Sequence, residues 1–167
     1  KDVQDEILQT LKDKIYFAND DVEKLNLIIA AGNTKSAILL DSVSPSLNSD
    51  NITLKSKAFK ALSNMPHDDV IETYLNAYEQ IEFSDRQMQF HALNGLKKMA
   101  LTENTIKWIS ERSLQLNNQT ETNRFINILG ANLSSNTIAE STLRELLTTD
   151  ISPQLKSDIY AFIEPLD

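Results

Sequence analysis

The sequence contains no cysteine, only three glycines and only four prolines among 167 residues. Without cysteine the chain can form no disulfide and offers no thiolate as a nucleophile or metal ligand. Strands and hairpins need turn residues at short intervals, so the scarcity of glycine and proline argues against a β-rich fold. The longest apolar run, Leu27 to Ala31, is far shorter than the roughly 18 residues of a membrane span. The sequence therefore predicts a soluble, all-α protein without a membrane span.

An excess of basic residues is also missing. Sixteen Lys and Arg stand against 24 Asp and Glu, which gives a formal net charge of −8, and the basic residues are scattered singly. Because such a chain repels a phosphate backbone, we expect no nucleic-acid binding. Acidic residues are frequent in the middle of the chain, at Glu72, Glu79, Glu82 and Asp85. If this acidic stretch contacts a partner, a basic partner would suit it.

Length and cysteine content bear on domain number and location. A chain of this size suits one domain and buries roughly 70% of its unfolded surface. The absence of cysteine fits either side of a membrane and slightly favours a bacterial periplasmic or secreted protein over a cytoplasmic one. The sequence begins at Lys1 and not at methionine, which indicates a cleaved signal peptide or the edge of a chosen fragment.

A helical pattern recurs along the chain. Phe59-Lys60-Ala61-Leu62, Phe90-His91-Ala92-Leu93 and Phe125-Ile126-Asn127-Ile128 begin 31 residues (59 to 90) and 35 residues (90 to 125) apart. Similar apolar segments begin at Leu25 and Ile159. A period between about 30 and 36 residues with helical spacing is typical of stacked helix pairs. We therefore expect Phe59, Phe90 and Phe125 to be buried at equivalent positions.

Helix-start and helix-stop signals predict about ten helices in a single helical-repeat domain, 1–167. We expect a leader helix at 1–18, helix pairs at 20–47, 50–82, 84–117 and 120–149, and a closing helix at 152–167. The predicted N-caps are Asp20, Thr34, Ser84, Thr102, Thr120, Ser134 and Ser152,, and residues 44–50 are predicted to form the longest loop. Short connections predict antiparallel neighbours.

Small residues and the leader helix give two further predictions. Gly32-Asn33 would end a helix in the left-handed conformation, while Gly95 and Gly130, with Ala30, would let facing helices approach closely. The leader helix would turn one apolar face inward and cover the end of the stack with a polar face. Its inward residues would be Val3, Ile7, Leu8, Leu11 and Ile15, and its outer residues Gln4, Asp5, Gln9, Lys12 and Asp13.

The Phe-x-Ala-Leu helix, the break after it and the acidic helix start Pro66-His67-Asp68-Asp69-Val70-Ile71 form a recognisable unit. From about Asp20 to Asp167 the chain resembles HEAT-type repeat proteins. That resemblance implies a right-handed stack of antiparallel helix pairs, an α-solenoid, and a role as an interaction scaffold. Tetratricopeptide repeats share the period, but their W-x₂-L-G-x₂-Y pattern is missing from this sequence.

One group of residues could hold a metal ion for hydrolysis. His67, Asp68, Asp69 and His91 carry the donor types that a metal-dependent hydrolase uses. The alternative interpretation is structural, because residues at 67–69 open a helix, where acidic side chains complement the helix dipole. We favour the structural interpretation and predict no metal, no cofactor and no catalysis.

Trp108 marks a candidate binding surface. It lies between Ile106 and Ile109 but about 100° away from their shared helix face, and Arg112 follows one turn later. Tryptophan and arginine are enriched at binding hot spots, and Tyr78 on the preceding second helix would extend the surface. The alternative is that Trp108 fills the seam between repeats. The sequence thus favours a non-catalytic scaffold that binds a protein or peptide, with a metal-dependent hydrolase or a purely structural spacer as alternatives.

Overall fold

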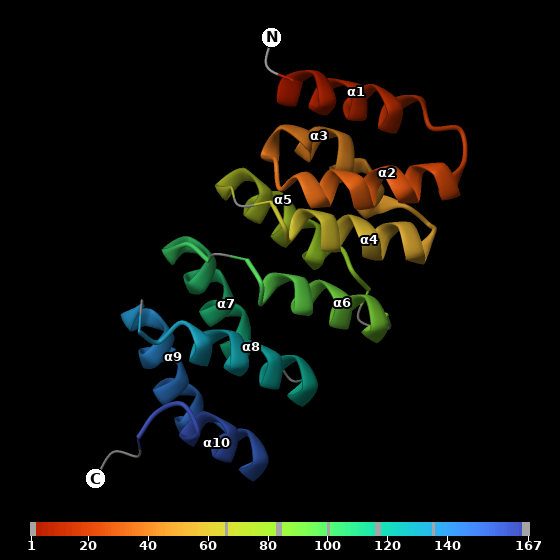
Figure 1. Cartoon of the computed structure of the whole chain (residues 1–167). Coiled ribbons are helices and arrows are strands. Elements are labelled where there is room, and N and C mark those ends of the chain that lie inside the picture. Colours follow the sequence, from red (N-terminus) through yellow and green to blue (C-terminus); the bar gives the residue numbers. More distant parts are fainter. Residues whose placement is uncertain are drawn as a thin grey trace. The chain divides into compact units, whose positions relative to one another are not determined.

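The computed structural model describes residues 3–65, 67–82, 85–99, 101–115, 118–134 and 136–164. Over these ranges the chain forms ten α-helices and two short 3-10 helices and contains no strand (Figure 1). This result confirms the predicted all-α class and the number of helices. No helix in the described ranges is long and apolar enough to cross a membrane. The helices are α1 (Val3–Phe17), α2 (Asp21–Thr34), η1 (Ala37–Leu39), α3 (Leu40–Val43), η2 (Ser44–Asn48), α4 (Ile52–Leu62), α5 (Asp68–Glu79), α6 (Arg86–Leu96), α7 (Glu103–Gln115), α8 (Gln119–Ala131), α9 (Thr137–Thr148) and α10 (Pro153–Tyr160).

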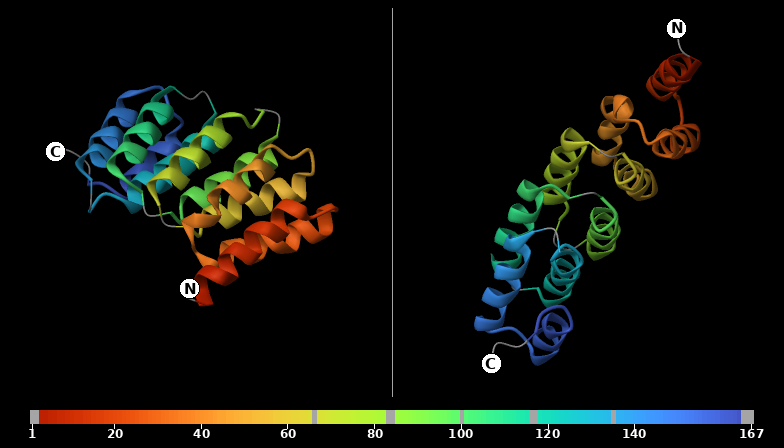
Figure 2. Two further views of the ribbon diagram at one scale, coloured as in Figure 1. Left: turned by 90° about the horizontal axis from the view of Figure 1, so that it is seen from above. Right: turned by 60° about the vertical axis from the view of Figure 1, so that its left-hand side comes forward.

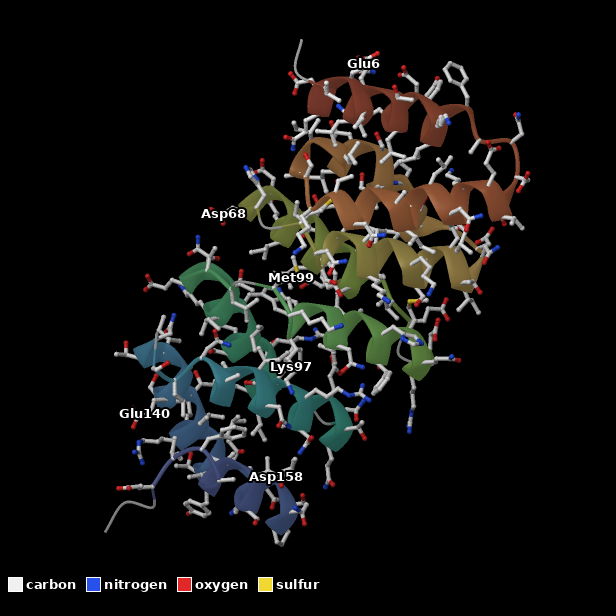
Figure 3. All side chains as sticks on the ribbon, in the orientation of Figure 1. Glu6, Asp68, Lys97, Met99, Glu140 and Asp158 are labelled. Carbon is white, nitrogen blue, oxygen red and sulfur yellow. The ribbon has the colours of Figure 1, made fainter. Side chains whose placement is uncertain are left out.

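The chain divides into two compact units, Lys1–Ala100 and Leu101–Asp167. In the first unit α4 packs between α2 and α6, and α1 packs against α2 and α3. In the second unit α7 packs beside α9, and α8 packs beside α10. The amide of Asn123 on α8 donates a hydrogen bond of 2.6 Å to Asp158 on α10 (Figure 3). Within each unit, helices two places apart in the chain are therefore neighbours, as expected for stacked helix pairs.

In the second unit α8 crosses its neighbour α9. In the right-hand view of Figure 2, α8 and α10 of the second unit are seen nearly end-on, whereas α7 and α9 lie across the view. The short connections between these helices predicted closely antiparallel neighbours. A short connection only requires the chain to turn back, and the packing of side-chain ridges into grooves sets the crossing angle.

Polar caps recur along the chain at a similar spacing. Side chains of Asp20, Asn51, Asp85, Asn118 and Ser152 accept hydrogen bonds from the first backbone N–H groups of α2, α4, α6, α8 and α10. The spacing is 31 residues (20 to 51) and then 34 (51 to 85), 33 (85 to 118) and 34 (118 to 152). The repeat is therefore more regular in its caps than in its phenylalanines.

Several predicted caps are confirmed and others are wrong. Asp20, Thr102 and Ser152 accept the expected backbone hydrogen bonds. Asn118 caps α8 in place of Thr120, and Asn136 caps α9 in place of Ser134. The start of α6 is capped by Asp85, while the predicted cap Ser84 lies outside the described residues. In each case either of two nearby polar residues could act as the N-cap, and the position at which the packed helix begins decides which of them does.

Burial of the phenylalanines is confirmed at two of the three positions, but their predicted equivalence is not, since Ile126 and not Phe125 takes the place of Phe59 when α4 and α8 are aligned on their caps. Phe59 and Phe125 are fully buried, but Phe90 is 43% exposed. When α4 and α6 are aligned on their caps, Leu93 takes the place of Phe59, and Leu93 is buried. Phe90 lies three residues earlier, on the edge of the buried face. The similar amino-acid sequences of the two segments therefore suggested an alignment that is shifted by one helical turn from the alignment of the caps.

Gly32 lies inside α2 and does not end it. The helix continues to Thr34, and Lys35 adopts the left-handed conformation with φ 55°. Gly32 is buried, and a Cβ atom at this position would lie 2.7 Å from the Cα of Ala61 on α4. The prediction of a glycine stop is wrong because this glycine is needed where the backbones of α2 and α4 meet. Ala30, which was expected to provide a close approach, is exposed.

The other two glycines face aromatic rings, in agreement with the predicted packing role. A Cβ at Gly95 would collide with the hydroxyl of Tyr74, and one at Gly130 would collide with the ring of Phe162. Tyr74 is fully buried, and its hydroxyl donates a hydrogen bond to the backbone oxygen of Ala92. Burial raises the pKa of Tyr74 well above its usual range,.

Residues 36–48 differ from the prediction. The expected loop at 44–50 contains η2, which Pro45 opens in its first turn, a position that suits the fixed φ of proline. Thr34 does not cap a helix, and its hydroxyl accepts a hydrogen bond from Ser36 N at 3.2 Å. Leu39 is buried as predicted, whereas Ile38 is exposed. Three short helical segments therefore follow α2, where one regular helix was expected, and they pack against α1 and α4.

Candidate functional site

A groove of about 410 Å³ runs between η2 and α5 in the first unit. Its lining is rich in side chains that both donate and accept hydrogen bonds, and it includes no lysine or arginine. The lining residues are Ser44, Pro45, Leu47, Asn48, Thr73, Asn76, Ala77 and Gln80. Helix α5 is the second helix of its pair, so the groove lies on the kind of helix on which the sequence predicted a binding surface.

The sequence of α5 separates a buried face from the groove face. Its apolar residues at helical spacing are all buried, namely Val70, Ile71, Tyr74, Leu75 and Tyr78,. Thr73, Asn76 and Gln80 follow one another at helical spacing on another side, and these three reach the groove,. Glu72 and Glu79 are exposed and directly precede Thr73 and Gln80. The groove is therefore polar and borders acidic side chains.

Tyr78 does not contribute to a surface. Only 3% of this residue is exposed, so its ring belongs to the core of the first unit. The prediction of Tyr78 as a contact residue is wrong, because Tyr78 follows Ile71, Tyr74 and Leu75 at helical spacing on the buried face of α5,.

Trp108 lies at the junction of α7 and α8 in the second unit. Its ring meets the fully buried ring of Phe125 edge-on, with centroids 6.2 Å apart and an interplanar angle of 76°. The residue as a whole is half-buried. Part of the tryptophan therefore packs between helices, as in the alternative interpretation of the sequence, and part remains open to solvent.

Arg112 lies one turn after Trp108 and is also half-buried. Its Nε atom is buried and has no hydrogen-bond partner among the described residues. An unsatisfied buried donor costs about 1–3 kcal/mol. Reorientation of this guanidinium toward an acceptor on a partner would break no existing hydrogen bond of Nε.

The residues of the alternative metal site have local roles. The Nδ1 atom of His67 accepts a hydrogen bond of 3.2 Å from Asp69 N and so caps α5. Asp68 lies exposed in the first turn of the same helix (Figure 3). His91 is exposed on α6, where its ring contacts Phe90. In the described part of the chain no three His, Asp or Glu side chains converge as a metal ion would need.

Comparison with known proteins gives evidence on the fold alone. No protein-family model matches the sequence, and no curated protein matches it either. Among solved structures, one similar chain is an engineered protein from a structural genomics consortium, with a TM-score of 0.52 and 15% identity. The match covers 91% of this chain and 46% of the engineered one, so the present chain spans about half of that protein's length.

Proposed function

We propose that this chain is a non-catalytic module that binds a protein or peptide partner along its second helices. The groove between η2 and α5 is the observation that supports the proposal most directly. The resemblance of the sequence to HEAT-type scaffolds supports the same function. The described residues offer no convergent set of metal ligands for the hydrolase alternative.

The chemistry of the groove favours an extended peptide segment. A peptide backbone carries one donor and one acceptor per residue, and the amides of Asn48, Asn76 and Gln80 can satisfy both. A volume of about 410 Å³ lies within the range of ligand-binding clefts. The adjacent Glu72 and Glu79 would attract a segment that contains lysine or arginine and would reject an acidic one.

The second unit would provide a separate contact through Trp108 and Arg112. A half-buried tryptophan presents a rigid apolar surface at low entropic cost, and an arginine beside it can pair with a carboxylate or carbonyl. Trp108 is the only tryptophan of the chain. Its fluorescence would therefore report directly whether a partner reaches this surface.

Selection from a displayed library of random peptides tests the proposal at the groove. We expect enrichment of peptides rich in lysine and arginine, and a loss of affinity of roughly tenfold or more on Asn76→Leu. Asn94→Leu is the matched control, because it replaces an exposed asparagine on α6 that does not line the groove. If no peptide is enriched, or if both variants bind equally well, the groove is not a binding site.

The same selected peptides test the contribution of Trp108. On addition of a peptide that contacts α7, the tryptophan emission should shift, and Trp108→Ala should weaken binding by about 2 kcal/mol. Because the ring also packs on Phe125, this variant should in addition unfold more easily. Reduced stability with unchanged peptide affinity would show that Trp108 only fills the seam between α7 and α8.

A further inference from the structure

The first helix carries an apolar stripe that its own unit leaves uncovered. Val3 is 70% exposed, Ile7 is 57% exposed and Phe17 is 70% exposed. Together with Thr10 and Lys14 they are spaced by four, three, four and three residues, so all five lie along one side of α1. The predicted polar cap is therefore wrong in part, because α1 buries Leu8 and Ile15 and leaves this second apolar side free.

A groove beside the stripe separates α1 from α2. It encloses about 520 Å³ and is mostly apolar, and its lining includes Leu11 of α1, Leu27 and Ala30 of α2 and four residues of the stripe, from Val3 to Lys14. The rim on α1 extends from Val3 to Lys14, a length of about 16 Å at 1.5 Å per residue. Glu6, labelled on α1 in Figure 3, is one of the residues that line this groove. The groove has the length and the apolar character to receive about three turns of a helix.

The stripe is complementary to itself when two copies run in opposite directions. With Thr10 at the centre, Glu6 faces Lys14, Val3 faces Phe17 and Ile7 faces the exposed Asp13, because each pair of numbers is symmetric about 10. A parallel arrangement would instead place Glu6 against Glu6 and Lys14 against Lys14. The charges therefore favour the antiparallel arrangement, in which every contact occurs twice about a two-fold axis.

We propose that this surface is the interface of a homodimer, in which the α1 helices of two copies pack antiparallel across Thr10. Each copy places the apolar side chains of its stripe at the groove between α1 and α2 of the other copy. Glu6 and Lys14 have no ion-pair partner among the described residues of their own chain. Both are therefore available for the two symmetric ion pairs between copies.

The central residue fits this arrangement. Thr10 is small, and its hydroxyl donates a hydrogen bond of 2.8 Å to the backbone oxygen of Glu6. The hydroxyl is therefore satisfied within its own helix when solvent is excluded from the two-fold contact. A larger or unsatisfied polar residue at this position would hold the two helices apart.

Sedimentation equilibrium tests the proposal by charge reversal. We expect the wild-type protein to dimerise between about 1 µM and about 1 mM. Glu6→Lys and Lys14→Glu should each weaken the dimer by roughly tenfold or more, because each places like charges together at both symmetric contacts. An equimolar mixture of these two variants should form a heterodimer, and the double variant should again form a homodimer.

Asp5→Lys is the matched control. It changes the net charge by the same amount in the same helical turn, but it lies on the side of α1 away from the stripe. This variant should dimerise like the wild-type protein. A monomeric wild-type protein at about 1 mM would overturn the proposal. A dimer that neither charge reversal weakens would also overturn it, as would an equimolar mixture of the two variants that fails to associate. The proposal would likewise be wrong if the protein stayed monomeric and its groove bound only a helix of another protein.

Discussion

Replacement of Gly95 by alanine should destabilise the protein, although the same change stabilises most helices. Alanine is favoured over glycine inside a helix by about 1 kcal/mol. At this position, however, the new methyl group would overlap the hydroxyl of Tyr74 and would lie 3.1 Å from its Cζ atom and 3.3 Å from Cβ of Ser63. The contact lies in the core of the first unit, where Tyr74 has no exposed surface.

The expected magnitude follows from three contributions. Overpacking of a core costs about 1–3 kcal/mol. Displacement of the Tyr74 hydroxyl from the backbone oxygen of Ala92 costs about 1 kcal/mol. The higher helix propensity of alanine offsets about 1 kcal/mol of this destabilisation. We therefore expect Gly95→Ala to lower the free energy of unfolding by about 1–3 kcal/mol.

A second substitution separates this mechanism from a general loss of stability. Tyr74→Phe removes the hydroxyl and should by itself cost about 1 kcal/mol. In that background Gly95→Ala should be nearly neutral, because the atom that the methyl group meets first is gone and only the two contacts above 3 Å remain. Urea unfolding followed by circular dichroism measures all four free energies of the double-mutant cycle.

Gly32→Ala provides the control, because its methyl group would meet Ala61 and not Tyr74. It should be destabilising to the same extent in both backgrounds. A stabilising effect of Gly95→Ala in the wild-type protein would refute the proposed overlap. An unchanged cost in the Tyr74→Phe background would show that the tyrosine hydroxyl is not the obstacle.

Three other predictions follow from the structure. Because burial raises the pKa of Tyr74, this residue stays protonated in the folded protein after it has lost its proton in the unfolded chain. The stability that the neutral Tyr74 provides is therefore complete below about pH 10 and is lost as the pH rises above it. In unfolding titrations above this pH, the free energy of unfolding of the wild-type protein should fall relative to that of Tyr74→Phe by about 1.4 kcal/mol per pH unit. Phe59→Ala should cost about 3–5 kcal/mol in urea unfolding, whereas Phe90→Ala should cost less than about 1 kcal/mol; equal costs would restore the equivalence of the two rings. Added zinc should not raise the melting temperature, and a rise that His67→Ala abolishes would instead support a metal site.

Helix positions could be predicted from the sequence because each helix carries its own signals. The buried face of α5, from Val70 to Tyr78, follows directly from apolar spacing,. The cap of α2 at Asp20 and the start of α10 at Ser152 depend on local hydrogen bonds that the sequence specifies within one turn,. These features need no information about the neighbouring helices.

Features that depend on neighbouring helices could not be predicted in the same way. The sequence Phe90-His91-Ala92-Leu93 resembles the segment at Phe59, but packing buries Leu93 and leaves Phe90 at the edge. Gly32 was predicted to end a helix. Its actual role is to leave room for the backbone of α4 at Ala61. The apolar spacing of α1 predicted that Val3 and Ile7 face inward with Leu8 and Ile15. Val3 and Ile7 are exposed instead, because the contacts with α2 and α3 bury the side of Leu8 and Ile15.

The hydrogen-bonding groove was missed because its two walls are distant in the sequence. Asn48 ends the short helix η2, and Asn76 lies near the middle of α5. Neither residue belongs to a motif, and only the packing of η2 against α5 brings them together. The signal available in the sequence was the Thr73, Asn76 and Gln80 spacing, which places polar side chains on a side of the helix away from its buried face.

The close approach of Gly32 to Ala61 also bears on how this protein can evolve. The nearest obstacle to a side chain at position 32 is a backbone atom of α4, so reduction of Ala61 to glycine would not make room for one. A larger residue at position 32 would have to move α4 away from α2, and α6, which packs on α4, would move with it. Position 32 is therefore a site where a single substitution would change the spacing of α2, α4 and α6 in the first unit without altering any of these helices.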